Sequence, residues 1–195
     1  MTSAPAAGPA DVRTLAITQN ATLDGSVEML GGWFDPQGQG GVDNSDLTVE
    51  LHRQNERSDA FLAGRRTFED LRSYWPEQSD DATGVTDHLN EVAKYVVSST
   101  MTDPQWRNST VLAGDPVEEV RALEEAPGRD IVVRGSITLC HALVRAGLVD
   151  EYRLFTYLVV QGRGRRLFPD GCEAPRLTLR GHAAFRSGIT YARYS

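Results

Sequence analysis

Apolar residues fall into short blocks along the first two thirds of the chain, and most blocks end at glycine, serine or threonine. Such blocks, bounded by turn residues, are typical of buried strands. Because segments with helical spacing separate them, the pattern predicts a parallel sheet built from strand–helix units. The blocks lie at 13–19, 60–64, 94–99, 110–114 and 131–136.

Five other segments carry apolar residues three or four positions apart, which predicts amphipathic helices. We expect Ser45 or Asp46 to cap the first helix and Gly147 to end the last. The fourth helix is expected to begin after Asp115, with Glu118 completing a capping box. The helical segments are 47–57, 65–75, 85–92, 115–126 and 138–147.

The last third of the chain contains strand-like segments at 151–160, 176–181 and 189–194, with no helix between them. Consecutive strands of this kind pair antiparallel, and about 45 residues of strand bury too little surface to fold alone. We therefore predict one α/β sandwich over 12–195, with helices on both faces of a mixed, mostly parallel sheet and antiparallel C-terminal strands. The Ala-, Pro- and Gly-rich residues 1–11 are expected to form a disordered tail.

The composition argues against several classes of protein. The net charge is −7 and Lys94 is the only lysine, whereas nucleic-acid binding requires clustered basic residues. No segment resembles a membrane helix or a secretory signal, so we expect a cytoplasmic protein. Cys140 and Cys172 are isolated and the four histidines lie in four different segments, so we expect no metal site.

The segment Gly64-Arg65-Arg66-Thr67 joins a predicted strand to a predicted helix. The glycine permits a sharp turn, and the free backbone N–H groups of the first helical turn favour an anion. Two arginines and a threonine hydroxyl add the donors that a phosphate monoester requires. An ordinary helix start with surface arginines explains the same spacing equally well.

Two further turns follow predicted strands. Ser98 and Ser99 lie at a carboxyl end, where open α/β sheets bind ligands, although serines in that position are commonly turn residues. Gly135 and Ser136 follow the strand at 131–134, and the glycine either permits close approach of a pyrophosphate or makes a tight connection. All three turns would share one edge of the sheet, an arrangement that suits NADP, whose 2′-phosphate is bound by arginine.

The order of these motifs resembles the dihydrofolate-reductase-like superfamily. The matching segments within 15–194 are TLDGSV, LAGRRTFE, VVSSTM, DIVVRGSITLCHALVRAGLVDEYRLF and VVQGRGRRLFPDG. Within the superfamily, the chain is similar to the C-terminal reductase domain of the bifunctional riboflavin-biosynthesis deaminase/reductase. Arg134 and Ser136 are departures, because dihydrofolate reductases carry more glycine at that turn. The resemblance implies a dihydrofolate-reductase-like fold and NADPH as cofactor, bound by Gly64, Arg65, Arg66, Thr67, Ser98, Ser99, Gly135 and Ser136.

The resemblance also implies hydride transfer to a small pterin-like, pyrimidine-like or carbonyl substrate. In dihydrofolate reductases an acid on the first helix assists protonation, and Asp46 and Glu50 lie in or near that helix, where a cap or a solvated residue is the alternative. Asp24 is a third candidate, although an aspartate before glycine is typical of a β-turn. Trp33 and Phe34, in the Gly-rich loop 31–44, are expected to contact the substrate under a closing lid and to raise the pKa of the acid.

Three functions stay open at this point. The first is an NADPH-dependent reductase, and the second is a nucleotide-binding protein on the same scaffold with weak or no activity, because no acid is clearly placed. The third is a reductase of riboflavin synthesis without its deaminase, whose zinc ligands the sequence lacks. The apolar segment 154–160 could join two copies in a homodimer, and it could equally be a core strand.

Overall fold

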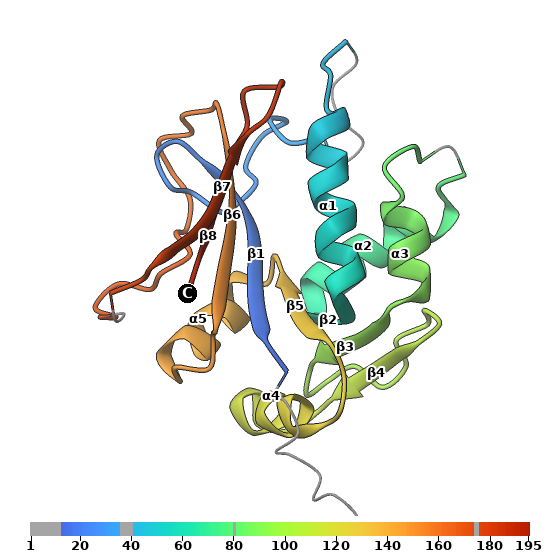
Figure 1. The fold of residues 1–195 in the computed structure, drawn as a ribbon. Coiled ribbons are helices and arrows are strands. Elements are labelled where there is room, and N and C mark those ends of the chain that lie inside the picture. Colours follow the sequence, from blue (N-terminus) through green and yellow to red (C-terminus); the bar gives the residue numbers. More distant parts are fainter. Residues whose placement is uncertain (1–12, 36–40, 80, 174–175) are drawn as a thin grey trace, which may run out of the picture.

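An eight-stranded sheet forms the centre of the molecule, in the order β4-β3-β2-β5-β1-β6-β8-β7. The computed structural model describes residues 13–35, 41–79, 81–173 and 176–195, so the predicted tail over 1–11 lies outside the described residues. The strands are β1 (Leu15–Thr22), β2 (Ser58–Gly64), β3 (Ala93–Val97), β4 (Ser109–Leu112), β5 (Asp130–Arg134), β6 (Glu151–Tyr157), β7 (Leu179–Ala184) and β8 (Thr190–Tyr194) (Figure 1).

The strand directions confirm the predicted mixed sheet. The six strands from β4 to β6 are parallel to their neighbours, whereas β8 is antiparallel to both β6 and β7. The sequence placed the seventh strand at 176–181, but β7 begins at Leu179 and continues to Ala184, because its partner β8 pairs with residues that far along the chain.

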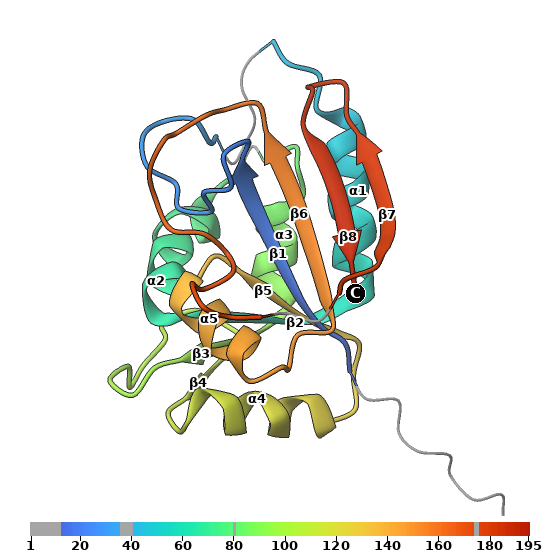
Figure 2. The same ribbon diagram turned by 90° about the vertical axis from the view of Figure 1, so that its left-hand side faces the viewer.

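Helices cover both faces of the sheet, as predicted. One face carries α1, α2 and α3, while α4 and α5 lie on the other side (Figures 1 and 2). The helices are α1 (Ser45–Arg57), α2 (Arg65–Tyr74), α3 (Val85–Glu91), α4 (Pro116–Glu125) and α5 (Ile137–Arg145), and a short 3₁₀ helix (Trp75–Glu77) follows α2.

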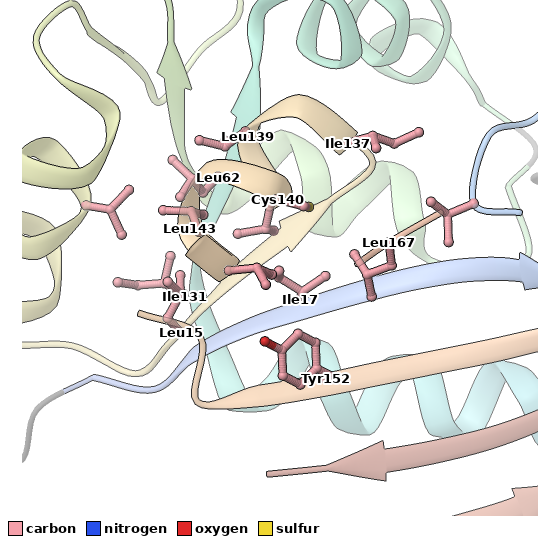
Figure 3. Close-up of a cluster of buried hydrophobic side chains, with 14 of the residues drawn as sticks. Leu15, Ile17, Leu62, Ile131, Ile137, Leu139, Cys140, Leu143, Tyr152 and Leu167 are labelled. Atoms are coloured by element: carbon pink, nitrogen blue, oxygen red, sulfur yellow. The ribbon is translucent and has the colours of Figure 1, made fainter. Parts of the chain in front are cut away.

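The largest apolar cluster lies between the sheet and the helices α4 and α5. Ile17 of β1 and Ile131 of β5 belong to it together with Leu139 of α5 (Figure 3). Because successive side chains of a strand point to opposite faces, Thr18 and Arg134 emerge on the other face, under α1, α2 and α3. This alternation brings polar groups from two central strands toward the candidate site.

The helix ends differ in detail from the predicted caps. Asp115 does cap α4, since its carboxylate accepts the N–H groups of Val117 and Glu118. The capping box is wrong, because the Glu118 side chain pairs with Arg121. Helix α1 begins at Ser45 with Asn44 in the cap position, one residue before the first cap proposed from the sequence.

Arg153 of β6 is a buried charge that the sequence analysis did not predict. Only 1% of its side chain is exposed, and its guanidinium donates to Asp130 at 2.6 Å and to Glu151 at 2.5 Å. Arg57 and Arg193 each lie 3.3 Å from one of these carboxylates. Since buried charges require partners, this cluster joins α1, β5, β6 and β8.

Candidate active site

The three turns proposed from the sequence lie side by side at one edge of the sheet. They follow β3, β2 and β5, which are consecutive and parallel. Parallel strands present their carboxyl ends at the same edge, where α/β proteins bind ligands. The structure therefore brings together all eight residues named as candidate cofactor ligands.

Hydrogen bonds connect these turns directly. The Ser136 Oγ accepts the backbone N–H of Gly64 at 2.8 Å, and the Thr67 Oγ1 accepts the N–H of Ser136 at 3.0 Å. The third turn is joined through Arg65, whose Nη1 donates to Thr100 Oγ1 at 2.8 Å. The turns therefore form one interlocked surface.

Gly135 and Ser136 have the left-handed backbone conformation, with φ of 60° and 52°. Glycine adopts this conformation without strain, and a Cβ at Gly135 would lie 2.9 Å from Thr67 Cγ2. Ser136 keeps a conformation that non-glycine residues rarely adopt, and both its side chain and its N–H are bonded to the neighbouring turn. A serine thus takes the place of glycine here because its hydroxyl holds the turns together.

Arg66 differs from the other candidate phosphate ligands because its side chain is exposed and has no hydrogen bond or ion pair with the described residues. Arg65 is already bonded to Glu69 and Thr100. The Ser98 Oγ accepts backbone N–H groups of its own turn, as a turn residue does, and Ser99 is exposed. Arg66 is therefore the cation most available to an incoming anion.

A cleft of about 1430 Å³ opens at this edge and extends toward α1. Sites for one drug-sized ligand measure roughly 300–1,000 Å³, so the cleft has room for two molecules. One end is lined by the three turns and by the first turns of α2 and α5. The other end is lined by Thr48 and Leu51 of α1, Phe155 and Tyr157 of β6, and Trp33 and Phe34.

Trp33 and Phe34 lie at the cleft, as proposed, and form an aromatic group with Tyr157. The three rings meet edge to face, with centroids 5.3 to 6.1 Å apart. Trp33 Nε1 donates to Gln161 Oε1 at 2.8 Å, which holds the loop against the segment after β6. Burial raises the pKa of Tyr157 to about 12, so its phenol is neutral at pH 7.

Asp24 is a structural carboxylate and does not fit the proposed role of proton donor. It accepts hydrogen bonds from the Thr22 hydroxyl at 2.6 Å and from the N–H groups of Gln161 and Gly162. These bonds lower the pKa of Asp24 to about 2, whereas a general acid at neutral pH needs a raised value. Asp24 is also absent from the cleft lining.

Asp46 and Glu50 also lie outside the cleft lining. Asp46 accepts the backbone N–H of Arg186 in the β7–β8 turn, and Glu50 accepts two hydrogen bonds from the Arg53 guanidinium. The hydrogen bonds from Arg53 and Gln54 lower the pKa of Glu50, although burial opposes them. Neither residue belongs to the row of α1 that lines the cleft, so their role as proton donors stays a prediction from the sequence.

We expect Asp24→Asn to lower thermal stability at pH 7 without changing NADPH affinity. Because the folded-state pKa of Asp24 lies below its ordinary value of 3.8, its stabilisation is present above about pH 4 and is lost as the pH falls toward 2. The difference between the melting temperatures of the two proteins should therefore narrow as the pH falls from 7 to 3. A variant with the wild-type melting temperature and no turnover would restore Asp24 as a catalytic acid.

The cleft contains inner residues that the sequence analysis did not assign to the substrate. They are Thr18, Asn55, His88 and Arg134. Burial lowers the pKa of His88 to about 4, with a smaller contribution from the charge of Arg134, so the imidazole is neutral at pH 7. The one signal in the sequence was Arg134 itself, an arginine at the end of an otherwise apolar strand.

No group of three or more histidine, cysteine or acidic side chains in the described part of the chain is arranged to bind a metal ion. No described helix is both long and apolar enough to cross a membrane.

Comparisons with known proteins agree with this architecture. The uncharacterized protein YyaP of Bacillus subtilis (strain 168) is 32% identical over 190 residues, which cover 93% of this chain and 94% of that protein. A putative riboflavin biosynthesis protein from Shewanella sp. PV-4 superposes with a TM-score of 0.66 at 17% identity, over 93% of this chain and 97% of that chain.

A dihydrofolate reductase from Enterococcus faecalis, solved in complex with NADP(H) and RAB-propyl, superposes with a TM-score of 0.58 at 15% identity. The alignment covers 93% of this chain and 95% of that enzyme. At such low identity, the two structural likenesses establish the dihydrofolate-reductase-like fold alone. The model of the RibD C-terminal domain matches residues 13–191, and the chain therefore belongs to the RibD C-terminal domain family.

Proposed function

We propose that the protein is an NADPH-dependent reductase that transfers a hydride to a small heterocyclic or carbonyl substrate. The observation that carries this proposal is the interlocked edge of three turns, where the first turns of α2 and α5 both line the cleft beside the unpaired Arg66. A helix N-terminus favours an anion through its free N–H groups and its dipole. Two such ends with one free arginine suit a dinucleotide that carries an additional phosphate.

The residues present fit NADPH in their donor chemistry. Arg66 and Arg65, with the hydroxyls of Ser99 and Thr100, would bind the 2′-phosphate at the start of α2, since arginine recognises phosphate through paired donors. The N–H groups at the start of α5 would bind the pyrophosphate. Gly135 leaves no room for a side chain against Thr67.

When bound, NADPH supplies the hydride, and the protein positions the two reactants. The end of the cleft near α1 would hold the substrate, between Thr48 and Leu51 on one side and the Trp33, Phe34 and Tyr157 rings on the other. The aromatic group would exclude water from the nicotinamide. The reductase-like family and the NADP(H) complex of the related enzyme fold support this assignment.

A nucleotide-binding protein with weak or no activity is the second candidate, and one observation favours it. Three of the described acidic residues line the cleft; Glu28 is paired with Arg165, and Asp35 and Asp70 are exposed. No carboxylate in the described part of the cleft is thus placed as a buried proton donor. A reductase of this kind would take its proton from water or from a hydroxyl of the site.

The decisive experiment measures NADPH binding and NADPH oxidation separately. Oxidation is followed by nicotinamide absorbance with dihydrofolate, the ribosylaminopyrimidinone phosphate of riboflavin synthesis, and a set of quinones and small carbonyl compounds. Turnover of any of them supports the reductase, whereas tight NADPH binding without turnover supports the second candidate. Failure to bind NADPH contradicts both. Homodimerisation and a cytoplasmic location stay predictions from the sequence.

A further inference from the structure

Arg134 is a guanidinium in the inner cleft that has no acidic partner among the described residues. Its one hydrogen bond within the described part of the chain is donated by Nη2 to Asn55 Oδ1 of α1, at 3.1 Å. A guanidinium keeps its positive charge at any physiological pH. Removing a charge from water is costly unless the charge is paired. Burial lowers the pKa of Arg134 to about 10, and the nearby charge of Arg153 adds to this effect.

A second polar group beside Arg134 also lacks a partner. Thr18 of β1 is aligned with Arg134 of β5 in the parallel ladder, so their side chains emerge next to each other on the same face. Both residues line the cleft. The Thr18 hydroxyl is buried and makes no hydrogen bond with the described residues, although buried hydroxyls normally have one.

The surroundings do not neutralise Arg134. His88 also lines the inner cleft and carries no charge at pH 7. Arg153, which is aligned with Thr18 on the adjacent strand β6, is cationic and is already bonded to Asp130 and Glu151. The inner cleft therefore has a net positive charge at Arg134, and two groups there, the Arg134 guanidinium and the Thr18 hydroxyl, have unused hydrogen-bond donors.

We propose that Arg134 and Thr18 form an oxyanion subsite, and that the substrate carries a carboxylate or phosphate group that binds there. This inference rests on the proposed function and specifies its substrate class. The anion would complete the pairing of Arg134 and give the Thr18 hydroxyl an acceptor. The same positive charge disfavours a substrate that is reduced as a protonated, cationic ring.

The test compares pairs of small molecules that differ in their charge, with NADPH-saturated protein so that the cofactor phosphate positions are filled. D-ribose 5-phosphate is compared with D-ribose, and benzoate with benzamide, by isothermal titration calorimetry. We expect the charged member of at least one pair to bind about tenfold or more tightly, the size of a charge-assisted hydrogen bond to arginine. The pair that shows this preference identifies phosphate or carboxylate as the recognised group.

Three variants test whether the preference for the charged compound depends on Arg134 and Thr18. Arg134→Gln is expected to abolish it, Arg134→Lys to retain part of it, and Thr18→Val to weaken it while keeping the side-chain shape. If Arg134→Gln does not fold, as judged by its melting temperature, the lysine and valine variants decide. Equal binding of charged and neutral members, no binding of either charged compound, or a preference that survives Arg134→Gln would each overturn the proposal.

The proposed function can fail separately from this inference. If the protein does not bind NADPH, the same titrations are made with the free protein, alongside Arg121→Ala as a second control, because Arg121 is an exposed arginine on α4 outside the cleft. A charge preference that Arg134→Gln removes and Arg121→Ala leaves intact would then establish the oxyanion subsite without the reductase.

Discussion

Replacing Arg66 with alanine is expected to weaken NADPH binding roughly 10- to 100-fold, because hydrogen bonds to charged groups contribute about 1.5–3 kcal/mol. Arg66 lines the cleft at the start of α2, and its guanidinium has no competing partner in the described part of the chain. NADH lacks the 2′-phosphate, so its affinity should change by no more than about threefold. Both dissociation constants can be measured by quenching of tryptophan fluorescence, since Trp33 and Trp75 line the cleft.

Two other arginines serve as controls for this result. Arg65→Ala should have a smaller effect than Arg66→Ala, because Arg65 already bonds Glu69 and Thr100. Arg121→Ala, in an exposed ion pair on α4, should leave both affinities unchanged. If Arg66→Ala weakened NADPH and NADH equally, the assignment of the 2′-phosphate to this turn would be wrong.

The three turns at the candidate cofactor site could be predicted from sequence, because each is a strand followed directly by a turn residue. A strand followed by Gly64 and a helix start fixes where the backbone turns, and parallel strands bring successive turns to one edge. The hydrogen bonds between the turns could not be predicted from the sequence, because Ser136 and Gly64 are 72 positions apart. Only the order of β2 and β5 in the sheet makes those residues neighbours.

The positions of the candidate acids could not be predicted, for a different reason. The helix over 45–57 was predicted nearly correctly, but the role of a carboxylate depends on the rotation of the helix and on the partner it finds. Leu47 and Leu51 line the cleft, whereas Asp46 and Glu50, each one position earlier and about 100° around the helix, turn to other partners. The apolar i, i+4 pair Leu47 and Leu51 was the feature of the sequence that indicated which side of the helix lines the cleft.

Arg153 lies in a predicted strand, EYRLFTY, where nothing in the spacing reveals its partners. Its two carboxylates come from β5 and from β6 itself, so the cluster exists only after the sheet has formed. The same limit applies to Arg134, because its proposed role depends on Thr18, which lies beside it on the adjacent strand. Charges within apolar strands can be noticed in sequence, but their pairing requires strand order.

Arg153→Met should lower the free energy of unfolding by about 3–5 kcal/mol at pH 7, the usual effect of removing one partner from a buried ion pair. Methionine fills a similar space, but Asp130 and Glu151 would keep only the longer contacts to Arg57 and Arg193. Urea unfolding followed by circular dichroism measures the change. Arg193→Met is the matched control, because its side chain is 25% exposed, and a change of about 1 kcal/mol or less is expected there.

The pH dependence separates an electrostatic loss from a loss of packing. Without Arg153, the buried carboxylates of Asp130 and Glu151 lose their shortest compensating contacts. If the loss is electrostatic, the stability deficit of the variant should be largest at pH 7 and should shrink as the pH falls toward 4, where carboxylates lose their charge. The triple variant Arg153→Met, Asp130→Asn, Glu151→Gln should recover much of the loss at pH 7, since it leaves no unpaired charge. A deficit that is independent of pH and persists in the triple variant would show that Arg153 acts through packing alone.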